Sequence, residues 1–179
     1  MKATGIVRKI DDLGRIVIPK EIRKNMHIKE GDPLEIFIET KGEVVLKKYA
    51  PMGNMLELAT DLASSLSNLT SMYILISDME NIIAEGSQKN RDYLSKQISD
   101  EVIEVINNRK TFTNNTHSKI PIVLGESRIV YTSQFIVPII SDSDVIGSVI
   151  ILSFDEKNIS DVDKALVTFA AEILSKQIS

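Results

Sequence analysis

Six basic residues lie between positions 8 and 24, around a short segment that contains a glycine, and four of them are the main candidates for binding. These four are Arg8, Arg15, Arg23 and Lys24, and the glycine is Gly14. The planar guanidinium group of arginine can donate two parallel hydrogen bonds, which matches a phosphate group or the O6 and N7 atoms of guanine. Double-stranded DNA presents closely spaced phosphates, so four cations along one rim would suit its backbone. The residue types and their spacing therefore predict a rim that binds DNA.

The uneven charge of the chain favours the same interpretation. The formal net charge is −4, yet residues 1–50 hold 11 Lys and Arg against 8 Asp and Glu, whereas residues 51–179 hold 10 against 17. A basic segment on an acidic chain indicates that this segment faces a polyanion, although an excess of three charges in 50 residues also fits chance variation. Lys2 and Lys9 are further candidate DNA contacts. Asp11 and Asp12 are expected to order the loop or to hold the arginines ready, because carboxylates are poor contacts for DNA.

Short strands and turns are expected to position these cations. Alternating apolar residues predict strands over residues 5–10 and 15–19, and one or two helical turns follow Pro19. A hairpin is predicted over residues 32–49, with its turn at Gly42. Its apolar face would carry Leu34, Ile36, Ile38, Val44 and Leu46.

A unit of about 50 residues is marginal as an independent domain, because it buries too little apolar surface alone. The chain has no Cys that could add a disulfide. We therefore expect the hairpins of two chains to share one core. If Ile16 and Ile18 face that core, Arg15 leaves the turn beside Gly14, which has no side chain to obstruct it. A second chain would double the four cations of the rim.

The remainder of the chain predicts a separate α+β domain. Pro51 and Gly53 break the strand pattern, so we place the first domain at residues 1–50, a linker at 51–54 and the second domain at 55–179. Consecutive hairpins favour an antiparallel sheet with the helices on one side. Helices are predicted over 54–69, 91–110 and 160–178, strands over 72–78, 82–87, 129–141 and 145–154, a loop over 111–127 and a hairpin turn at 142–144. Ser160 is the expected N-cap of the last helix.

Apolar stripes run along the predicted helices of the second domain. The stripes of the first and last helices are too wide for helices that lie alone on a surface, and they include Leu62, Leu66, Leu69, Leu166, Phe169 and Ile173. Packing of these two helices on each other within one chain would cover part of the stripes. We expect a bundle between chains in addition, with these residues at the oligomer interface. The middle helix is expected to present Leu94, Ile98, Val102 and Val105 on one face.

Four motifs in the first 50 residues resemble a known family in their order and spacing. The motifs TGIVRKID, LGRIVIPKEIR, GDPLEIF and VVLKKY are similar to the AbrB-like DNA-binding domain of bacterial transition-state regulators. The resemblance implies a swapped-hairpin β-barrel dimer that binds double-stranded DNA through Arg8, Arg15, Arg23 and Lys24. Many members carry a second arginine where this chain has Lys24. Lysine keeps the charge but lacks the planar fork, so a base-reading role is not expected to carry over unchanged.

The second domain resembles a GAF domain more loosely, through its element order and the segment FIVPIISDSDVIGSVIILS. The whole chain resembles a family of sporulation regulators of spore-forming Firmicutes that joins both domains. The resemblance implies homotetramers, activation and repression of sporulation genes, and a cytoplasmic, nucleoid-associated location in the forespore. GAF-like domains often hold a small ligand, and Arg91, Tyr93, Asn114 and Asn115 offer polar groups for one. Ordinary solvated loop residues are the simpler interpretation of these four.

The chain offers no constellation that would indicate an enzyme, a metal site or a bound cofactor. Its two histidines, His27 and His117, lie in unrelated segments, and without Cys it cannot attach a bilin or perform thiol chemistry. It shows neither a Walker loop nor a Gly-rich phosphate fingerprint. The longest apolar runs fall short of the roughly 20 residues of a membrane helix. We therefore expect no catalysis, no cofactor and no membrane partner.

Two other functions remain as alternatives. An antitoxin of a toxin–antitoxin pair uses the same swapped-hairpin fold, but it usually continues into a short, poorly ordered tail that binds the toxin. Residues 54–179 instead show strong periodicity. A ligand-binding protein without a DNA role would leave the basic cluster unexplained. A DNA-binding transcriptional regulator is therefore the favoured interpretation.

Overall fold

The computed structural model describes residues 6–26, 28, 30–31, 33–40, 42–48, 55–86, 93–115 and 118–177. The predicted linker at 51–54, together with Lys2, His27, Arg91 and His117, lies outside these residues, and the domain limits stay a prediction. Packing divides the chain into two units, Met1–Tyr49 and Ala50–Ser179, and each is described by itself. Within the described ranges, no helix has the length and apolar character needed to cross a membrane.

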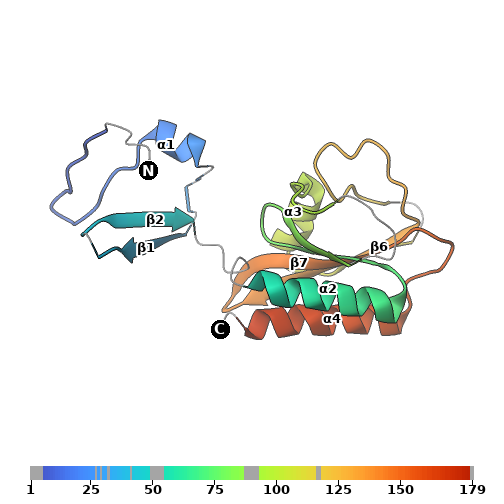
Figure 1. The fold of residues 1–179 in the computed structure, drawn as a ribbon. Helices are drawn as coiled ribbons and strands as arrows, with labels where there is room; N and C mark the ends of the chain where they lie inside the picture. Colours follow the sequence, from blue (N-terminus) through green and yellow to red (C-terminus); the bar gives the residue numbers. More distant parts are fainter. Residues whose placement is uncertain are drawn as a thin grey trace. The chain divides into compact units, whose positions relative to one another are not determined.

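The first unit combines an extended segment, a short helix and a hairpin (Figure 1). Helix α1, Lys20–Asn25, follows Pro19 as predicted. Strands β1, Leu34–Ile38, and β2, Val44–Lys48, pair antiparallel, with Ile36 opposite Leu46 and Ile38 opposite Val44. Because directly opposed residues point to the same side of a sheet, the predicted apolar face of the hairpin is confirmed.

The strands predicted over residues 5–10 and 15–19 are wrong for the described single chain. Residues 6–10 and 15–19 are extended, but no described strand includes them. Their apolar side chains lie in solvent, with Val7 85%, Ile10 66% and Val17 72% exposed. A strand needs a neighbour that satisfies its backbone groups, and the alternating pattern alone does not supply one.

The second unit is built on a five-stranded antiparallel sheet in the order β4-β3-β7-β6-β5. Its strands are β3 Tyr73–Ser77, β4 Ile82–Gly86, β5 Phe112–Asn115, β6 Ser133–Ser141 and β7 Asp144–Ser153. The antiparallel sheet is confirmed, and so is the hairpin turn, where Asp142 and Ser143 both have positive φ. Strand β5 lies in the segment predicted as a loop. Its sequence FTNN has no alternating pattern, and pairing with β6 decides its conformation.

The helices of the second unit cover both faces of the sheet, not one face as predicted. Helices α2, Leu56–Thr70, and α4, Asp161–Lys176, lie side by side along one face, and α3, Asp100–Asn107, covers the other (Figure 1). A separate apolar core fills the space between the sheet and each helical layer.

Helix α3 begins nine residues later than predicted. Ser99 caps it, because its Oγ accepts a hydrogen bond from the Val102 amide at 3.1 Å. The preceding residues form bridges instead, with Gln97 opposite Asn81 and Ile98 opposite Val123. Leu94 is 47% exposed as a result. Apolar spacing alone did not reveal these non-local bridges.

Helix α2 packs on the sheet through small residues together with Leu66, and not through the whole of its leucine stripe. Ala59, Ala63 and Ser67 are buried, whereas Leu58 and Leu62 are only half-buried. The approach is closest at Gly86 of β4, where an added Cβ would lie 1.9 Å from the Ala63 carbonyl oxygen. Glycine therefore permits this contact between helix and strand.

Helix α4 begins with the predicted cap. Ser160 Oγ accepts a hydrogen bond from the Asp163 amide, and the Asp163 carboxylate accepts one from the Ser160 amide at 2.9 Å. This reciprocal capping box satisfies two backbone donors at the start of the helix. Asp163 is 7% exposed, so the cap forms part of the packed domain.

Candidate nucleic-acid interface

The basic segment contains a turn that is ordered by one carboxylate. Asp11 Oδ1 accepts hydrogen bonds from the amides of Leu13 at 3.0 Å and Arg15 at 2.7 Å. Asp11 Oδ2 accepts a hydrogen bond from Arg15 Nε at 2.8 Å. The turn is closed by backbone hydrogen bonds from Gly14 N to Asp11 O and from Asp11 N to Arg15 O, both at 3.0 Å. The expectation that Asp11 orders the loop and holds an arginine is confirmed.

These hydrogen bonds favour the ionised form of Asp11. The bond from the Arg15 amide, followed by the bond from its guanidinium group, lowers the pKa of Asp11 below its ordinary value. Gly14 is needed for a different reason than predicted. Its φ is +76°, in the left-handed region, and an added Cβ would meet no atom within 4 Å. Backbone conformation, and not free space for Arg15, selects glycine there.

The described cations are accessible but belong to two elements. The Arg15 side chain is 70% exposed, and Arg8 and Lys9 are exposed in the extended segment that leads into the turn. Lys24 is exposed and Arg23 half-buried in the last turn of α1, where cations favour the helix dipole. Their DNA-binding role stays a prediction, as does that of Lys2, which lies outside the described residues.

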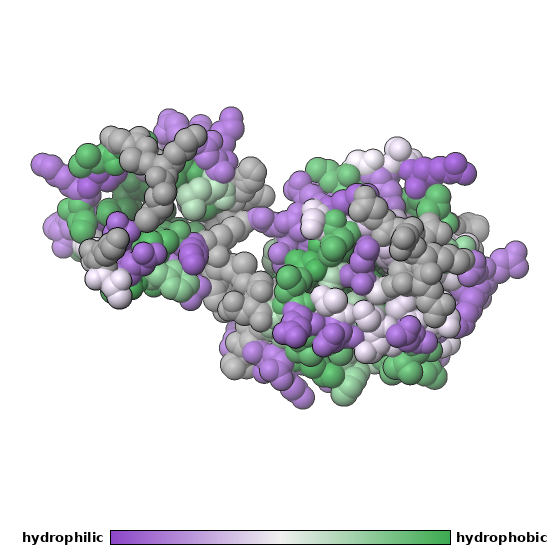
Figure 2. All heavy atoms as spheres, viewed as in Figure 1, coloured by the Kyte–Doolittle hydropathy of each residue, from purple (hydrophilic) through white to green (hydrophobic). Residues whose placement is uncertain are grey.

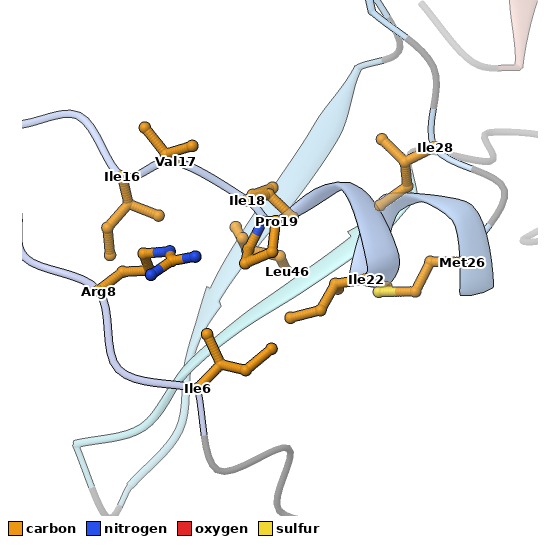
Figure 3. Close-up of a pocket in the computed structure, with 10 residues that line it drawn as sticks. All are labelled: Ile6, Arg8, Ile16, Val17, Ile18, Pro19, Ile22, Met26, Ile28 and Leu46. Carbon is orange, nitrogen blue, oxygen red and sulfur yellow. The ribbon is translucent and has the colours of Figure 1, made fainter.

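An apolar groove of about 190 Å³ lies between the extended segment, α1 and β2. In Figure 3 the Arg8 side chain points across it, beside Ile16 and above Ile6. The other lining residues are Val17, Ile18, Pro19, Ile22, Met26, Ile28 and Leu46. Ile16, Val17 and Met26 are 50%, 72% and 44% exposed. Arg8 therefore lies at an apolar surface that the described single chain leaves largely uncovered.

In the second unit, a group of aromatic side chains belongs to the same apolar core as the buried residues of α3. Tyr73 contacts Tyr93 and Phe154 edge-on, each with ring centroids 5.8 Å apart, and Tyr131 contacts Phe154 at 6.0 Å. Tyr73, Tyr93 and Tyr131 are all nearly buried. The interpretation of Tyr93 as a solvated loop residue is therefore wrong.

Two glutamates hold the hydroxyl groups of this aromatic cluster. Tyr73 Oη donates to Glu85 at 3.0 Å, and Tyr93 Oη donates to Glu126 at 2.7 Å. Tyr131 Oη donates to the Ile120 carbonyl. Burial, followed by the negative charge of Glu126, raises the pKa of Tyr131 far above its ordinary value. Sequence reasoning did not find this cluster, because its members come from distant segments with no common spacing.

Asn114 is a second residue that the solvated-loop interpretation places wrongly. It is 3% exposed in β5, and its Nδ2 donates to Ser118 Oγ at 3.4 Å. Its Oδ1 and the hydroxyl of Ser133 are buried without a hydrogen-bond partner among the described residues. The Asn115 side chain is not among those that the structure describes. Within the described ranges, no group of three or more acidic or His side chains is placed to hold a metal ion.

Apolar residues of α2 and α4 that are exposed or half-buried form a surface that we call the helix seam. It consists of Leu58, Leu62, Leu69, Val162, Leu166, Phe169 and Ile173, which recur every three or four residues, apart from a gap at Ser65. Leu69 is 71% and Phe169 61% exposed, and Figure 2 shows hydrophobic atoms on the surface over both helices. Leu66 differs from the prediction, because it is 5% exposed in the core between α2 and the sheet.

Comparison with family models divides the chain at the same region as its packing. Residues 54–179 match the model described as "Stage V sporulation protein T C-terminal, transcription factor". Residues 7–54 match the model described as "Antidote-toxin recognition MazE, bacterial antitoxin". The second match covers only the N-terminal unit.

The chain is 41% identical over 178 residues to stage V sporulation protein T of Bacillus subtilis (strain 168), which covers 99% of each chain. It is 55% identical over 51 residues to the transition state regulatory protein AbrB of the same bacterium, covering 28% of this chain and 52% of AbrB. The GAF domain from an Acinetobacter phosphoenolpyruvate-protein phosphotransferase aligns with a TM-score of 0.58 at 12% identity, over 69% of this chain and 81% of that one. That last likeness shows the fold alone.

These comparisons confirm the predicted combination of an AbrB-like DNA-binding domain and a GAF fold. The likeness to the sporulation protein extends through both units, and not merely through one of them. The chain therefore belongs to the stage V sporulation protein T family of transcription factors.

Proposed function

We propose that this chain binds double-stranded DNA as a dimer of its first unit, and that it activates and represses sporulation genes in the forespore. The observation that carries the proposal is the ordered turn at residues 11–15, which presents a largely exposed Arg15. Arg8, Lys9, Arg23 and Lys24 would add contacts from neighbouring elements. Phosphate contacts of this kind fix a protein on the duplex, while base contacts select the sequence.

Pairing of two first units follows from the apolar surface around the groove. Ile36, Ile38 and Val44 on the hairpin face are 66%, 82% and 65% exposed, and the groove walls are similarly open. Contiguous apolar surface of this kind is costly in water and marks an interface. A second copy of the extended segment would supply the missing strand neighbours and cover the hairpin face, because it carries the same alternating apolar residues.

The helix seam supports assembly of the second units. Its residues lie about a third of a turn around α2 and α4 from the buried residues that pack on the sheet. One pair of helices can therefore contact the sheet and a second pair of helices together. Joined to pairing of the first units, this contact would produce a tetramer.

A small ligand of the second unit is a further proposal, supported by Asn114 Oδ1 in β5. A buried polar atom without a partner is costly, and a bound polar molecule would satisfy it.

The antitoxin function has weaker support. The match to the antitoxin model ends at residue 54, whereas residues 54–179 match a transcription-factor model. The second unit is a folded domain with two apolar cores, unlike the short tail expected of an antitoxin.

Duplex binding by the full-length chain across a salt series tests the proposed function. The logarithm of the affinity should fall with the logarithm of salt concentration, by roughly 0.9 per phosphate neutralised. Arg15→Ala should cost roughly 1–3 kcal/mol of affinity with folding intact. Glu39→Ala, at the exposed hairpin turn, serves as a control that should bind normally. Absence of duplex binding at low salt would contradict the proposal.

A further inference from the structure

The two carboxylate oxygens of Asp11 have separate roles. Oδ1 accepts hydrogen bonds from the backbone amides of Leu13 and Arg15, and these bonds fix the conformation of the turn. Oδ2 accepts a hydrogen bond from Arg15 Nε, and this bond restrains the Arg15 side chain. Asp12 carries the same charge at the next position, but the described residues show no ion pair between it and Arg15. The chain therefore contains a matched pair of neighbouring carboxylates, one bound to the arginine and one not.

The bond to Oδ2 determines which edge of the guanidinium group remains available. Arginine can form paired hydrogen bonds through its side edge, which includes Nε, or through its end, which consists of both terminal nitrogens. Because Asp11 occupies Nε, a further paired interaction must use the end. The side chain is 70% exposed, so this end is accessible to a large partner.

We propose that Asp11 is a positioning residue for DNA recognition, which makes Arg15 approach the double helix with its two terminal nitrogens. This inference rests on the proposed DNA-binding function. The target is a DNA group with two neighbouring acceptors, either the oxygens of one phosphate or O6 and N7 of one guanine. An arginine that is restrained before binding loses less side-chain entropy on contact, so the same hydrogen bonds yield a higher affinity.

Charge alone predicts the opposite effect of Asp11. A carboxylate beside the phosphate backbone repels DNA, so its removal should strengthen binding if it has no other role. Asp12→Asn measures that effect of charge at the same turn. Asp11→Asn removes the same charge but retains an Oδ1 that can accept the two amide bonds, while its amide nitrogen cannot accept from Arg15 Nε.

The experiment measures the full-length chain on a duplex that the chain itself has selected from a random pool. Binding is compared for the wild type, Asp11→Asn and Asp12→Asn, each with and without Arg15→Ala. Asp11→Ser is a second variant, because its hydroxyl can accept an amide bond but is too short to reach the guanidinium group. Thermal unfolding and backbone amide spectra show that each variant keeps its turn.

Arg15→Ala should weaken binding roughly 5- to 150-fold in the wild type and in Asp12→Asn. The same substitution should weaken binding less than about threefold in Asp11→Asn, because the unrestrained arginine contributes less. Asp11→Asn should also bind more weakly than Asp12→Asn. Without DNA, the Arg15 Nε–H signal should be protected from solvent exchange in Asp12→Asn and unprotected in Asp11→Asn.

An equal effect of Arg15→Ala in all three backgrounds would overturn the inference while leaving the proposed function intact. Failure of the wild type to bind any duplex would overturn both. If binding supports the inference, two further readouts identify the acceptor. A salt slope that is reduced by about one in Asp11→Asn indicates a phosphate. A loss of Arg15 dependence on a duplex with 7-deazaguanine, which lacks N7, indicates guanine.

Discussion

The surroundings of Tyr131 determine how the stability of the second unit depends on alkaline pH. Its hydroxyl is buried, donates to the Ile120 carbonyl and lies 3.5 Å from Glu126 Oε2. Ionisation would place a second negative charge beside Glu126 and would remove the donated hydrogen bond. Burial, followed by the negative charge of Glu126, therefore favours the neutral phenol and raises the pKa of Tyr131.

Tyr131→Phe should weaken the dependence of stability on alkaline pH. The unfolded chain releases the phenol proton near pH 10, while the folded domain retains it because the folded pKa is higher. Below pH 10, the neutral Tyr131 phenol therefore makes its full contribution to the free energy of unfolding of the wild type. Above pH 10, that free energy falls by up to about 1.4 kcal/mol per pH unit. Urea unfolding between pH 7 and 11 measures this difference. Identical slopes for wild type and variant would contradict the prediction.

Elements that depend on local chemistry could be predicted from the sequence. The α4 cap, the β1–β2 register and the β6–β7 turn each follow from the nature and spacing of nearby residues. Elements that depend on distant partners could not. Strand β5 and the late start of α3 both result from pairing with segments elsewhere in the chain. The same limit applies to the candidate site, where the Asp11–Arg15 contact is local but the aromatic cluster is not.

The leucine stripe of α2 is a case in which the element was predicted correctly and its buried face was not. Leucines dominate the hydrophobic pattern, but Ala59 and Ala63 allow the backbone to approach β4 at Gly86. The larger side chains then lie beside the contact and remain partly exposed. A pattern of apolar residues therefore identifies a helix more reliably than it identifies which apolar residues pack on the sheet.

Substitution of the helix seam should separate assembly from folding. Leu69→Gln with Phe169→Gln should halve the particle mass, because both side chains are mostly exposed and their removal leaves the core intact. Leu66→Ala is the matched control. It should cost about 2–5 kcal/mol of stability by leaving a cavity, without changing the particle mass. Light scattering and thermal unfolding measure the two effects. An unchanged mass in the double variant would show that the seam is not an interface.

The chain consists of two units that differ in how much apolar surface each buries by itself. The second unit buries two apolar cores around its sheet. The first unit has a two-stranded sheet, and Ile28 is its one buried apolar residue among those described. A two-stranded hairpin is marginal in water, so the first unit is the part that needs a second copy.

A fragment that ends at Ala50 should form a folded dimer that binds DNA. The expected pairing covers the groove and the hairpin face, and it uses no residue of the second unit. Analytical ultracentrifugation and circular dichroism, followed by the duplex assay, measure this outcome. A monomeric and unfolded fragment would contradict it and would show that the second unit is required for pairing.

The open groove of the first unit also has a consequence for how the protein responds to dilution. If folding of that unit is coupled to association, its melting temperature depends on protein concentration. Tethering through the helix seam would keep first units at a high effective concentration, in the millimolar range for short flexible connections. DNA affinity would then depend on the apolar residues of α2 and α4 as well as on the cations of the first unit.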